Sequence, residues 1–251
     1  MKDPVRVLLK ALRLLQVPRF RAAMRQGVGA AIEHAVVLRA LRARGIGRVV
    51  DIGANVGQFA LGVREYLPDA EVLGFEPLAA AARRFRAVHG ADSRVRLVEA
   101  AVGPVAGTQS LHVSKAADSS SLLPIGAAQE STFPGTGESH LETVRVLRLE
   151  DELPDSGMPV PTLVKIDVQG FELEVLRGCE SRLALIDLIY VECSFVELYE
   201  RQALAGEIVA WLGERGFRLC GIGSVSADRD GGLVQADLLF ERAAVHHVTG
   251  M

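Results

Sequence analysis

Four acidic residues lie at the ends of apolar segments, at positions where a carboxylate can bind a ligand or accept a proton. They are Asp51, Glu76, Asp167 and Glu192. Short apolar runs of this kind are typical of buried parallel strands, whose carboxyl ends share one edge of a sheet. Because ligands of open α/β sheets bind beyond that edge, we expect the four carboxylates to surround a single site.

A glycine-rich loop follows the first of these acids. Gly53 allows a sharp backbone turn, and Gly57 stands where a helix begins and must lie close to the strand. A strand, a glycine turn and a helix N-terminus together form a cradle for a nucleotide-like ligand. An ordinary strand–helix turn would contain the same glycines. However, Glu76 lies 19 residues beyond Gly57, near the ~20-residue interval at which an acid binds ribose hydroxyls, so we favour a cofactor loop.

The sequence of this loop distinguishes between two cofactors. A dinucleotide loop has a glycine where this chain has Asn55, and Asp51 would repel a pyrophosphate. The same acid would attract a ligand with a cationic amine and a sulfonium, which describes S-adenosylmethionine. Ala100, at the exit of the third apolar segment, would lie near the adenine. The predicted cofactor-binding residues are Asp51, Gly53, Ala54, Asn55, Gly57, Glu76, Pro77, Ala100 and Asp167.

Composition restricts the class of protein. The chain has 251 residues, of which 49% are hydrophobic, enough for one domain with a sizeable core. A net charge of −3 and 5% aromatic residues argue against a nucleic-acid partner. Three cysteines without a pairing pattern indicate buried thiols of a reducing compartment. With no apolar run of ~18 residues and no secretory signal, we expect a cytoplasmic protein.

No spacing of His and Cys residues indicates a transition-metal site, and we predict no metal, although clustered acids can bind Mg²⁺. The pattern of elements predicts an α/β fold with a doubly wound sheet of about seven strands. Residues 217–222 and 235–240 predict an antiparallel edge hairpin. We divide the chain into a helical appendage over residues 1–44, a main domain over 45–243 and a tail over 244–251. The sequence does not indicate an oligomeric state.

Residues 1–26 contain seven Lys and Arg residues and one acidic residue. Their apolar residues fall on one face of a helix: Val5, Leu8, Leu9, Leu12 and Leu15. A basic amphipathic helix can bind an anionic membrane surface or a protein partner. Alternatively, it covers part of the fold and leaves its charges in water, which is the more common use of an apolar stripe.

Residues 103–148 predict a lid-like insertion. Residues 103–107 predict a tight turn, and residues 109–113 alternate like the partner strand of a hairpin. Residues 118–140 are rich in Gly, Ser, Thr and Pro and form the longest predicted loop. Its candidate acceptor-binding residues are Ser119, Ser120, Ser121 and His140. A plain linker loop is the alternative.

Four motifs, taken in order, resemble the FkbM family of S-adenosylmethionine-dependent methyltransferases. They are Val-Asp-Ile-Gly-Ala-Asn-Val-Gly (50–57), Gly-Phe-Glu-Pro (74–77), the serine run 119–121 before Leu122, and Lys-Ile-Asp-Val-Gln-Gly-Phe-Glu (165–172). The resemblance covers roughly residues 48–195. It implies the sheet of class I methyltransferases and O-methylation, often of sugar or polyketide hydroxyls. The family usually has Glu where this chain has Gln169, so we assign Gln169 no catalytic role.

Methyl transfer to a hydroxyl requires a positioned oxygen and a base for its proton. Asp167 is the first candidate for the base and Glu192 the second, while Glu172 is a candidate acceptor contact. Alternatively, Asp167 holds the cofactor or caps the next helix, and Glu172 lies on an exposed helix surface. We predict an S-adenosylmethionine-dependent O-methyltransferase acting on a glycan, sugar or natural-product hydroxyl. The alternatives are a nicotinamide-dependent oxidoreductase and a cofactor-binding protein without catalytic activity.

Overall fold

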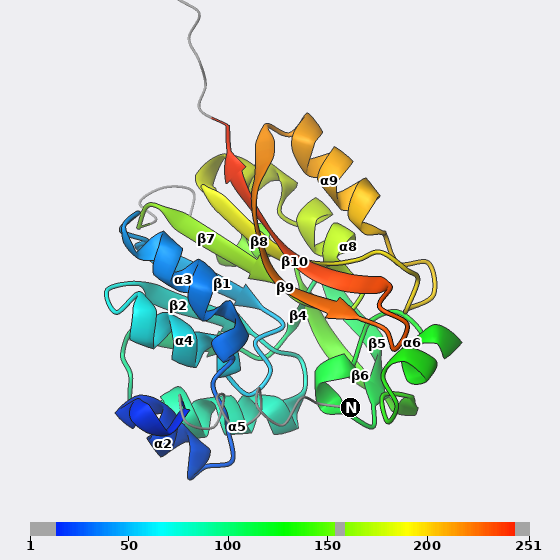
Figure 1. Cartoon of the computed structure of the whole chain (residues 1–251), viewed down its shortest axis with the longest axis horizontal. Coiled ribbons are helices and arrows are strands. Elements are labelled where there is room, and N and C mark those ends of the chain that lie inside the picture. Colours follow the sequence, from blue (N-terminus) through cyan, green and yellow to red (C-terminus); the bar gives the residue numbers. More distant parts are fainter. Residues whose placement is uncertain (1–13, 154–158, 244–251) are drawn as a thin grey trace, which may run out of the picture.

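A seven-stranded sheet lies at the centre of the computed structural model, which describes residues 14–153 and 159–243 (Figure 1). The strands are β1 (Arg48–Ile52), β2 (Glu71–Phe75), β3 (Val95–Val98), β7 (Thr162–Ile166), β8 (Leu188–Ser194), β9 (Phe217–Ala227) and β10 (Leu233–Arg242). Their order is β3-β2-β1-β7-β8-β10-β9. The strands from β3 to β8 in this order are parallel, whereas β10 is antiparallel to β8 and β9. The predicted doubly wound sheet with an antiparallel edge hairpin is therefore confirmed.

Helices cover both faces of this sheet (Figure 1). Their bounds are α2 (Pro18–Met24), η1 (Ile32–His34), α3 (Ala35–Arg42), α4 (Gln58–Tyr66), α5 (Ala79–His89), α8 (Glu172–Arg177), η3 (Glu180–Leu185) and α9 (Ala205–Glu214). Leu41 of α3 and Phe85 of α5 share a buried cluster with Val49 of β1. Leu176 of α8 belongs to a second cluster, together with Val50. Since neighbouring strand residues point to opposite faces, the two clusters lie on opposite sides of the sheet.

A smaller sheet lies on the same side as α8. It consists of β4 (Ala101–Val102), β5 (Gly107–Ser114) and β6 (Glu138–Leu147), in the order β4-β6-β5. Val102 and Val146 belong to the same buried cluster as Leu176, so this sheet covers part of the large sheet as a helix would.

Two details of residues 103–148 differ from the sequence prediction. Residues 109–113 pair with the distant strand β6, and not with the strand before the turn. Residues 118–140 do not form one loop, because they contain the end of η2 (Ala117–Ser119), the whole of α6 (Ala127–Thr132) and the start of β6. The exposed first half of β6 is polar, so its side chains gave no alternating apolar signal.

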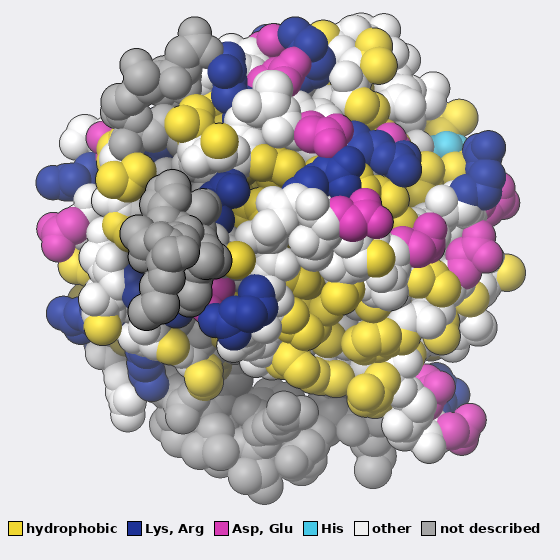
Figure 2. Space-filling model, turned by 90° about the horizontal axis from the view of Figure 1, so that it is seen from above, with side chains coloured by type: hydrophobic (Ala, Val, Ile, Leu, Met, Phe, Trp, Pro, Cys, Tyr) yellow, Lys and Arg dark blue, Asp and Glu magenta, His cyan; other side chains and the backbone are white. Residues whose placement is uncertain are grey.

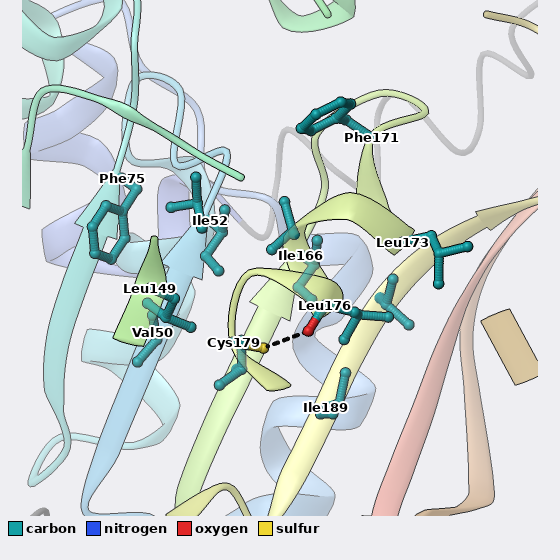
Figure 3. Close-up of a cluster of buried hydrophobic side chains, with 14 of the residues drawn as sticks. Val50, Ile52, Phe75, Leu149, Ile166, Phe171, Leu173, Leu176, Cys179 and Ile189 are labelled. Carbon is teal, nitrogen blue, oxygen red and sulfur yellow. Dashed lines mark hydrogen bonds between the residues drawn. The ribbon is translucent and has the colours of Figure 1, made fainter. Parts of the chain in front are cut away.

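Figure 3 shows the packing that fixes the two central strands. Val50 and Ile52 of β1 and Ile166 of β7 lie in one cluster with Leu176 of α8 and Leu149 of α7 (Leu149–Glu152). All five side chains are almost fully buried, and burying each contributes about 1.5–3 kcal/mol. This packing holds the carboxyl ends of β1 and β7 side by side.

The three cysteines differ in their exposure to solvent. Cys179 and Cys193 are buried, as predicted, whereas Cys220 is exposed on β9. The Cys179 thiol donates to the carbonyl oxygen of Leu176 over 3.2 Å (Figure 3). Apolar side chains also lie at the surface (Figure 2), and those on the edge hairpin include Leu219 and Ile222.

The N-terminal segment is described only in part. Residues 1–13, which are half of the predicted basic helix over residues 1–26, and the tail over 244–251 lie outside the described residues. In the described part, Phe20 and Ala23 of α2 pack against Leu61 of α4. None of the helices in the described ranges is both long and apolar enough to cross a membrane.

Candidate active site

A cavity of about 550 Å³ lies at the carboxyl ends of β1, β2 and β7. This volume is within the range of ~300–1,000 Å³ that is typical of small-molecule sites. Part of the wall comes from the loops that follow the parallel strands, and part comes from η1, residues 117–122 and α6 with the residues after it. The cavity therefore lies at the sheet edge where the sequence placed the four acids.

The predicted site residues divide into two groups. The cavity wall includes Gly53, Ala54, Asn55, Glu76, Pro77, Ala100, Ser119, Ser120, Ser121 and Asp167. The wall does not include Asp51, Gly57, His140, Glu172 or Glu192. Two of the four acids thus face the cavity, and the other two, Asp51 and Glu192, contact side chains of its wall.

Two glycines shape the loop after β1. Gly53 has φ +79°, and a Cβ there would lie 1.8 Å from the carbonyl oxygen of Asp167. Gly57 has φ +88° at the N-cap of α4, and a Cβ there would lie 2.5 Å from Nε2 of His89. Both positions therefore require glycine, and Gly57 does so without lining the cavity itself. Asn55, between them, is also left-handed, with φ +47°. Asparagine tolerates this conformation better than most residues, and such conformations concentrate at functional sites.

Glu76 organises the loop through its carboxylate. Oε2 accepts a hydrogen bond from the backbone N–H of Asn55 over 2.9 Å, and Oε1 accepts one from Leu78 over 2.8 Å. The residue is 5% exposed. Burial raises the pKa of Glu76 to about 7, although the two backbone N–H groups lower it in part. Each carboxylate oxygen has a second lone pair, so Glu76 can still accept hydrogen bonds from a ligand.

Lys165 lies between two carboxylates. Its Nζ is 3.3 Å from Oδ1 of Asp51 and 3.3 Å from Oδ2 of Asp167. The Asp51 side chain is fully buried, and the Asp167 side chain keeps 30% of its surface exposed. One ammonium thus faces two carboxylates. Asp51 was expected to face the ligand directly, but its position within strand β1 turns it toward Lys165 instead.

The two carboxylates of this cluster respond differently to their surroundings. Burial raises the pKa of Asp51 above its ordinary value, and the charge of Lys165 offsets this only in part. Burial also acts on Asp167, but the charge of Lys165 and the hydrogen bond from Gln169 outweigh it and lower the pKa. Asp167 is therefore the carboxylate that stays ionised at the cavity wall.

Gln169 joins Asp167 to Glu192. Its Nε2 donates to Oδ1 of Asp167 over 2.8 Å and to Oε2 of Glu192 over 3.0 Å, while its Oε1 accepts from the Tyr199 hydroxyl over 2.8 Å. Glu192 Oε2 also accepts from Nε2 of Gln235 over 2.9 Å. Burial, followed by the charge of Asp167, raises the pKa of Glu192 well above its ordinary value. Gln169 is thus the bridge of a carboxylate pair, with φ +58°, a role that the sequence analysis did not assign to it.

The predicted acceptor-binding residues differ in whether they reach the cavity. Ser120 Oγ accepts from the N–H of Ser114, and Ser121 Oγ accepts from the N–H of Leu123, so both hydroxyls hold the loop. His140 lies on exposed β6 beside Glu142 and does not reach the cavity. Glu172 is neither a cavity residue nor an exposed helix residue.

The carboxylate of Glu172 is buried and supports the loop after β7. Its Oε1 accepts from the N–H groups of Val168 and Gly170 over 3.1 and 3.0 Å. Burial raises the pKa of Glu172 to about 7. The alternative of an exposed surface residue, considered for Glu172 from the sequence, is therefore wrong.

The structure adds a buried polar group that the sequence did not indicate. His34 lines the cavity, and its Nδ1 is 3.0 Å from Oη of Tyr190 and 3.5 Å from Oδ2 of Asp237. Asp237 also accepts a hydrogen bond from the Ser224 hydroxyl. The ring of His34 meets those of Phe59 and Tyr190 edge-on. No sequence spacing connects these residues, because they meet only when η1 packs over β8 and β10.

Comparison with known proteins identifies the family. Residues 51–219 match the family model described as the methyltransferase FkbM domain. The chain belongs to this family. Among similar curated proteins, 2-O-methyltransferase NoeI of Sinorhizobium fredii is 32% identical over 168 residues, covering 61% of this chain and 66% of NoeI. The 31-O-demethyl-FK506 methyltransferase FkbM of Streptomyces tacrolimicus is 30% identical over 225 residues, covering 80% of this chain and 78% of that protein.

A solved structure supports the fold. A protein from Klebsiella pneumoniae that is named as an O-methyltransferase has a TM-score of 0.54 and 18% identity, covering 95% of this chain and 96% of that one. The predicted class I methyltransferase fold is confirmed, and membership of the FkbM methyltransferase family makes the protein a methyltransferase. A nicotinamide-dependent oxidoreductase is accordingly not favoured. In the described ranges, no group of three or more His, Cys, Asp or Glu side chains is arranged to hold a metal ion.

Proposed function

We propose that this methyltransferase uses S-adenosylmethionine and methylates a hydroxyl oxygen of a sugar, glycan or natural product. Two relatives support O-methylation by name, since NoeI is a 2-O-methyltransferase and FkbM is a 31-O-demethyl-FK506 methyltransferase. The observation that carries the proposal is the combination of Glu76 and the two carboxylates beside Lys165 at one cavity.

The residues at the cavity fit the donor in charge and in hydrogen bonding. Glu76 would accept hydrogen bonds from the ribose hydroxyls through its remaining lone pairs. Asp167, with Asp51 behind it, would attract the cationic amine and the sulfonium. Ala100 would lie beside the adenine, and the backbone of residues 53–55 would approach the donor closely. When bound, S-adenosylmethionine supplies an electrophilic methyl group on its sulfonium.

Asp167 is the proposed proton acceptor. It lines the cavity, and nearly a third of its side chain is exposed, so an acceptor oxygen can reach it. Its lowered pKa makes it a weak base. However, a hydroxyl becomes far more acidic as its oxygen gains a methyl group, so a weak base can take the proton late in the transfer. Glu192 is the second candidate. Its raised pKa favours the protonated form, which cannot accept a proton, and Gln169 lies between it and Asp167.

The proposal also assigns roles to the segments outside the donor loops. Residues 103–148 would act as the acceptor-facing part of the methyltransferase domain, with the helical appendage over residues 1–44 before it. The proposal also includes docking of the basic segment over residues 1–26 on a membrane surface or a protein partner, and a cytoplasmic location. The supporting observation for the acceptor-facing role is that residues 117–122 and 129–136 contribute to the cavity wall.

Calorimetric titration tests the proposal. S-adenosylmethionine and S-adenosylhomocysteine should both bind, and NAD should not, because a pyrophosphate would face the carboxylate of Asp167 with Asp51 behind it. Binding of NAD without binding of the other two ligands would contradict the proposed function. Transfer of the methyl group to oxygen can then be followed by mass spectrometry with a labelled donor, and a product methylated on nitrogen or carbon would contradict the O-methylation.

A further inference from the structure

The side-chain amide of Gln129 lies in the cavity wall without a protein partner. The residue is on α6 and is 2% exposed, and its Oε1 is buried with no hydrogen bond. Its backbone is fully paired, because its N–H donates to Gly126 and its carbonyl accepts from Phe133. Within the described ranges, neither polar atom of the amide has a hydrogen bond, so only this group of the residue lacks a partner.

A second buried glutamine shows what a structural amide looks like in this protein. Gln202 is 6% exposed, and its Oε1 accepts hydrogen bonds from the N–H groups of Leu198 and Tyr199, leaving only its nitrogen unpaired. Gln202 therefore holds a turn together. An amide buried without partners costs folding free energy, and buried polar groups in native proteins nearly always have partners. The simplest partner for Gln129 is a ligand.

The surroundings of Gln129 indicate which ligand this is. The donor-facing residues lie on the loops after β1, β2 and β3, whereas Gln129, Phe133 and Thr136 lie on the segment after η2. The Tyr199 hydroxyl lies 3.0 Å from the carbonyl oxygen of Ser119, in the same wall, and 2.8 Å from Oε1 of Gln169, and it can donate its one hydrogen to either. Gln129 thus lines the cavity from a different segment of the chain than the loops that carry the residues assigned to the nucleoside of the donor.

We propose that Gln129 anchors the acceptor by binding two neighbouring hydroxyl groups, as on adjacent carbons of a sugar ring. One hydroxyl would donate to the amide oxygen, and the oxygen of the other would accept from the amide nitrogen. Because neither amide atom has a protein partner, the amide can turn over without breaking a hydrogen bond, and so it can meet the pair in either order. The partly buried ring of Phe133 offers an apolar surface to the C–H groups of the same ring. This inference rests on the proposed function, since it names the acceptor of that reaction.

Stability separates this role from a structural one. In Gln129→Leu, an unpaired amide is replaced by an apolar group of similar size, so the melting temperature should stay the same or rise. In the matched control Gln202→Leu, two backbone N–H groups lose their acceptor, so the melting temperature should fall. A drop for Gln129→Leu as large as that for Gln202→Leu would show that Gln129 is structural and would overturn the inference.

Acceptor binding is tested with methyl glycosides of glucose, galactose and mannose. In ¹⁵N-labelled protein with S-adenosylhomocysteine, the side-chain amide signal that is missing in Gln129→Leu should shift when a glycoside binds. Methyl transfer to that glycoside should then show a KM raised ~10–100-fold in Gln129→Leu, with unchanged donor affinity and a smaller change in kcat. A glycoside that lacks one of the two hydroxyls should bind wild type as weakly as the complete glycoside binds the variant.

Two results would count against the inference in different ways. If the donor binds but no glycoside shifts the Gln129 amide signal at millimolar concentration, the inference is wrong and the proposed function stands. If neither S-adenosylmethionine nor S-adenosylhomocysteine binds, the proposed function fails, and the inference that rests on it fails too.

Discussion

Replacing Lys165 with Met should destabilise the protein strongly. Lys165 is 5% exposed in its side chain, and its ammonium lies between the carboxylates of Asp51 and Asp167. Methionine fills nearly the same space but carries no charge. The substitution therefore leaves the packing largely intact but removes the positive charge that faces two carboxylates. One of these carboxylates, that of Asp51, has no access to water.

The size of the effect follows from the two distances. At 3.3 Å and an effective dielectric constant of ~20, each ion pair contributes roughly 5 kcal/mol of Coulomb energy. Desolvation offsets much of this, and removing one partner of a buried pair typically costs ~3–5 kcal/mol. We expect a loss in this range for Lys165→Met, which is a large share of the ~5–15 kcal/mol that stabilises a typical domain.

The loss should depend on pH through Asp51. Burial already raises the pKa of Asp51 above its value of 3.8 in the unfolded chain. Without the ammonium, that pKa rises further, so the folded variant holds a proton that the unfolded chain releases. The contribution of such a group to stability is complete below the unfolded pKa and is lost as pH rises through the folded pKa. The difference between variant and wild type should therefore be larger at pH 8 than at pH 5.

Urea unfolding followed by circular dichroism at pH 5 and pH 8 measures this difference. The matched control is Lys115→Met, because Lys115 is exposed and the same substitution there should change the free energy of unfolding by no more than about 0.5 kcal/mol. A loss for Lys165→Met below about 1 kcal/mol, equal at both pH values, would refute the reasoning about the buried cluster.

Three further substitutions test the site. Glu76→Ala should weaken S-adenosylmethionine binding ~10–100-fold, and unchanged affinity in a folded variant would show that Glu76 does not bind the ribose. Asp167→Asn should lower single-turnover methyl transfer ~10²–10⁴-fold, a loss much larger than the accompanying loss of donor affinity. A parallel loss of affinity would assign Asp167 to donor orientation, and full activity would exclude both roles. Gln169→Glu places a third carboxylate beside Asp167 and Glu192. Repulsion from its neighbours raises the pKa of the introduced carboxyl group above its value in the unfolded chain. The melting temperature should therefore fall more at pH 8 than at pH 5. Equal melting temperatures for variant and wild type at both pH values would contradict this.

The sequence predicted the parts of the fold that local patterns encode. Buried parallel strands are nearly continuous apolar runs, so β1, β2 and β7 and the acids after them could be located before the structure was known. Gly53 and Gly57 could be assigned because left-handed and crowded backbone positions accept few other residues. The family resemblance rested on the same local motifs.

The sequence could not show which side chains meet in space. His34 and Asp237 are 203 positions apart and come together only through the packing of η1 on β10. Gln129 has no motif, and its missing partners become visible only when every neighbour is placed. Asp51 was expected at the ligand because it ends an apolar run, but its side chain turns to Lys165 on the adjacent strand. Local patterns gave the positions of these residues along the chain, but not the directions in which their side chains point.

The central claim is that the carboxylate of Glu76 binds the donor at this cavity. The most direct test is calorimetric titration with S-adenosylhomocysteine at pH 6 and pH 8. Burial raises the pKa of Glu76 to about 7, and only the ionised carboxylate accepts both ribose hydroxyls. The affinity of wild type should thus increase ~10-fold from pH 6 to pH 8, with proton release on binding near pH 7, and Glu76→Gln should abolish both effects. Equal wild-type affinity at the two pH values, or the same increase in Glu76→Gln, would contradict the claim.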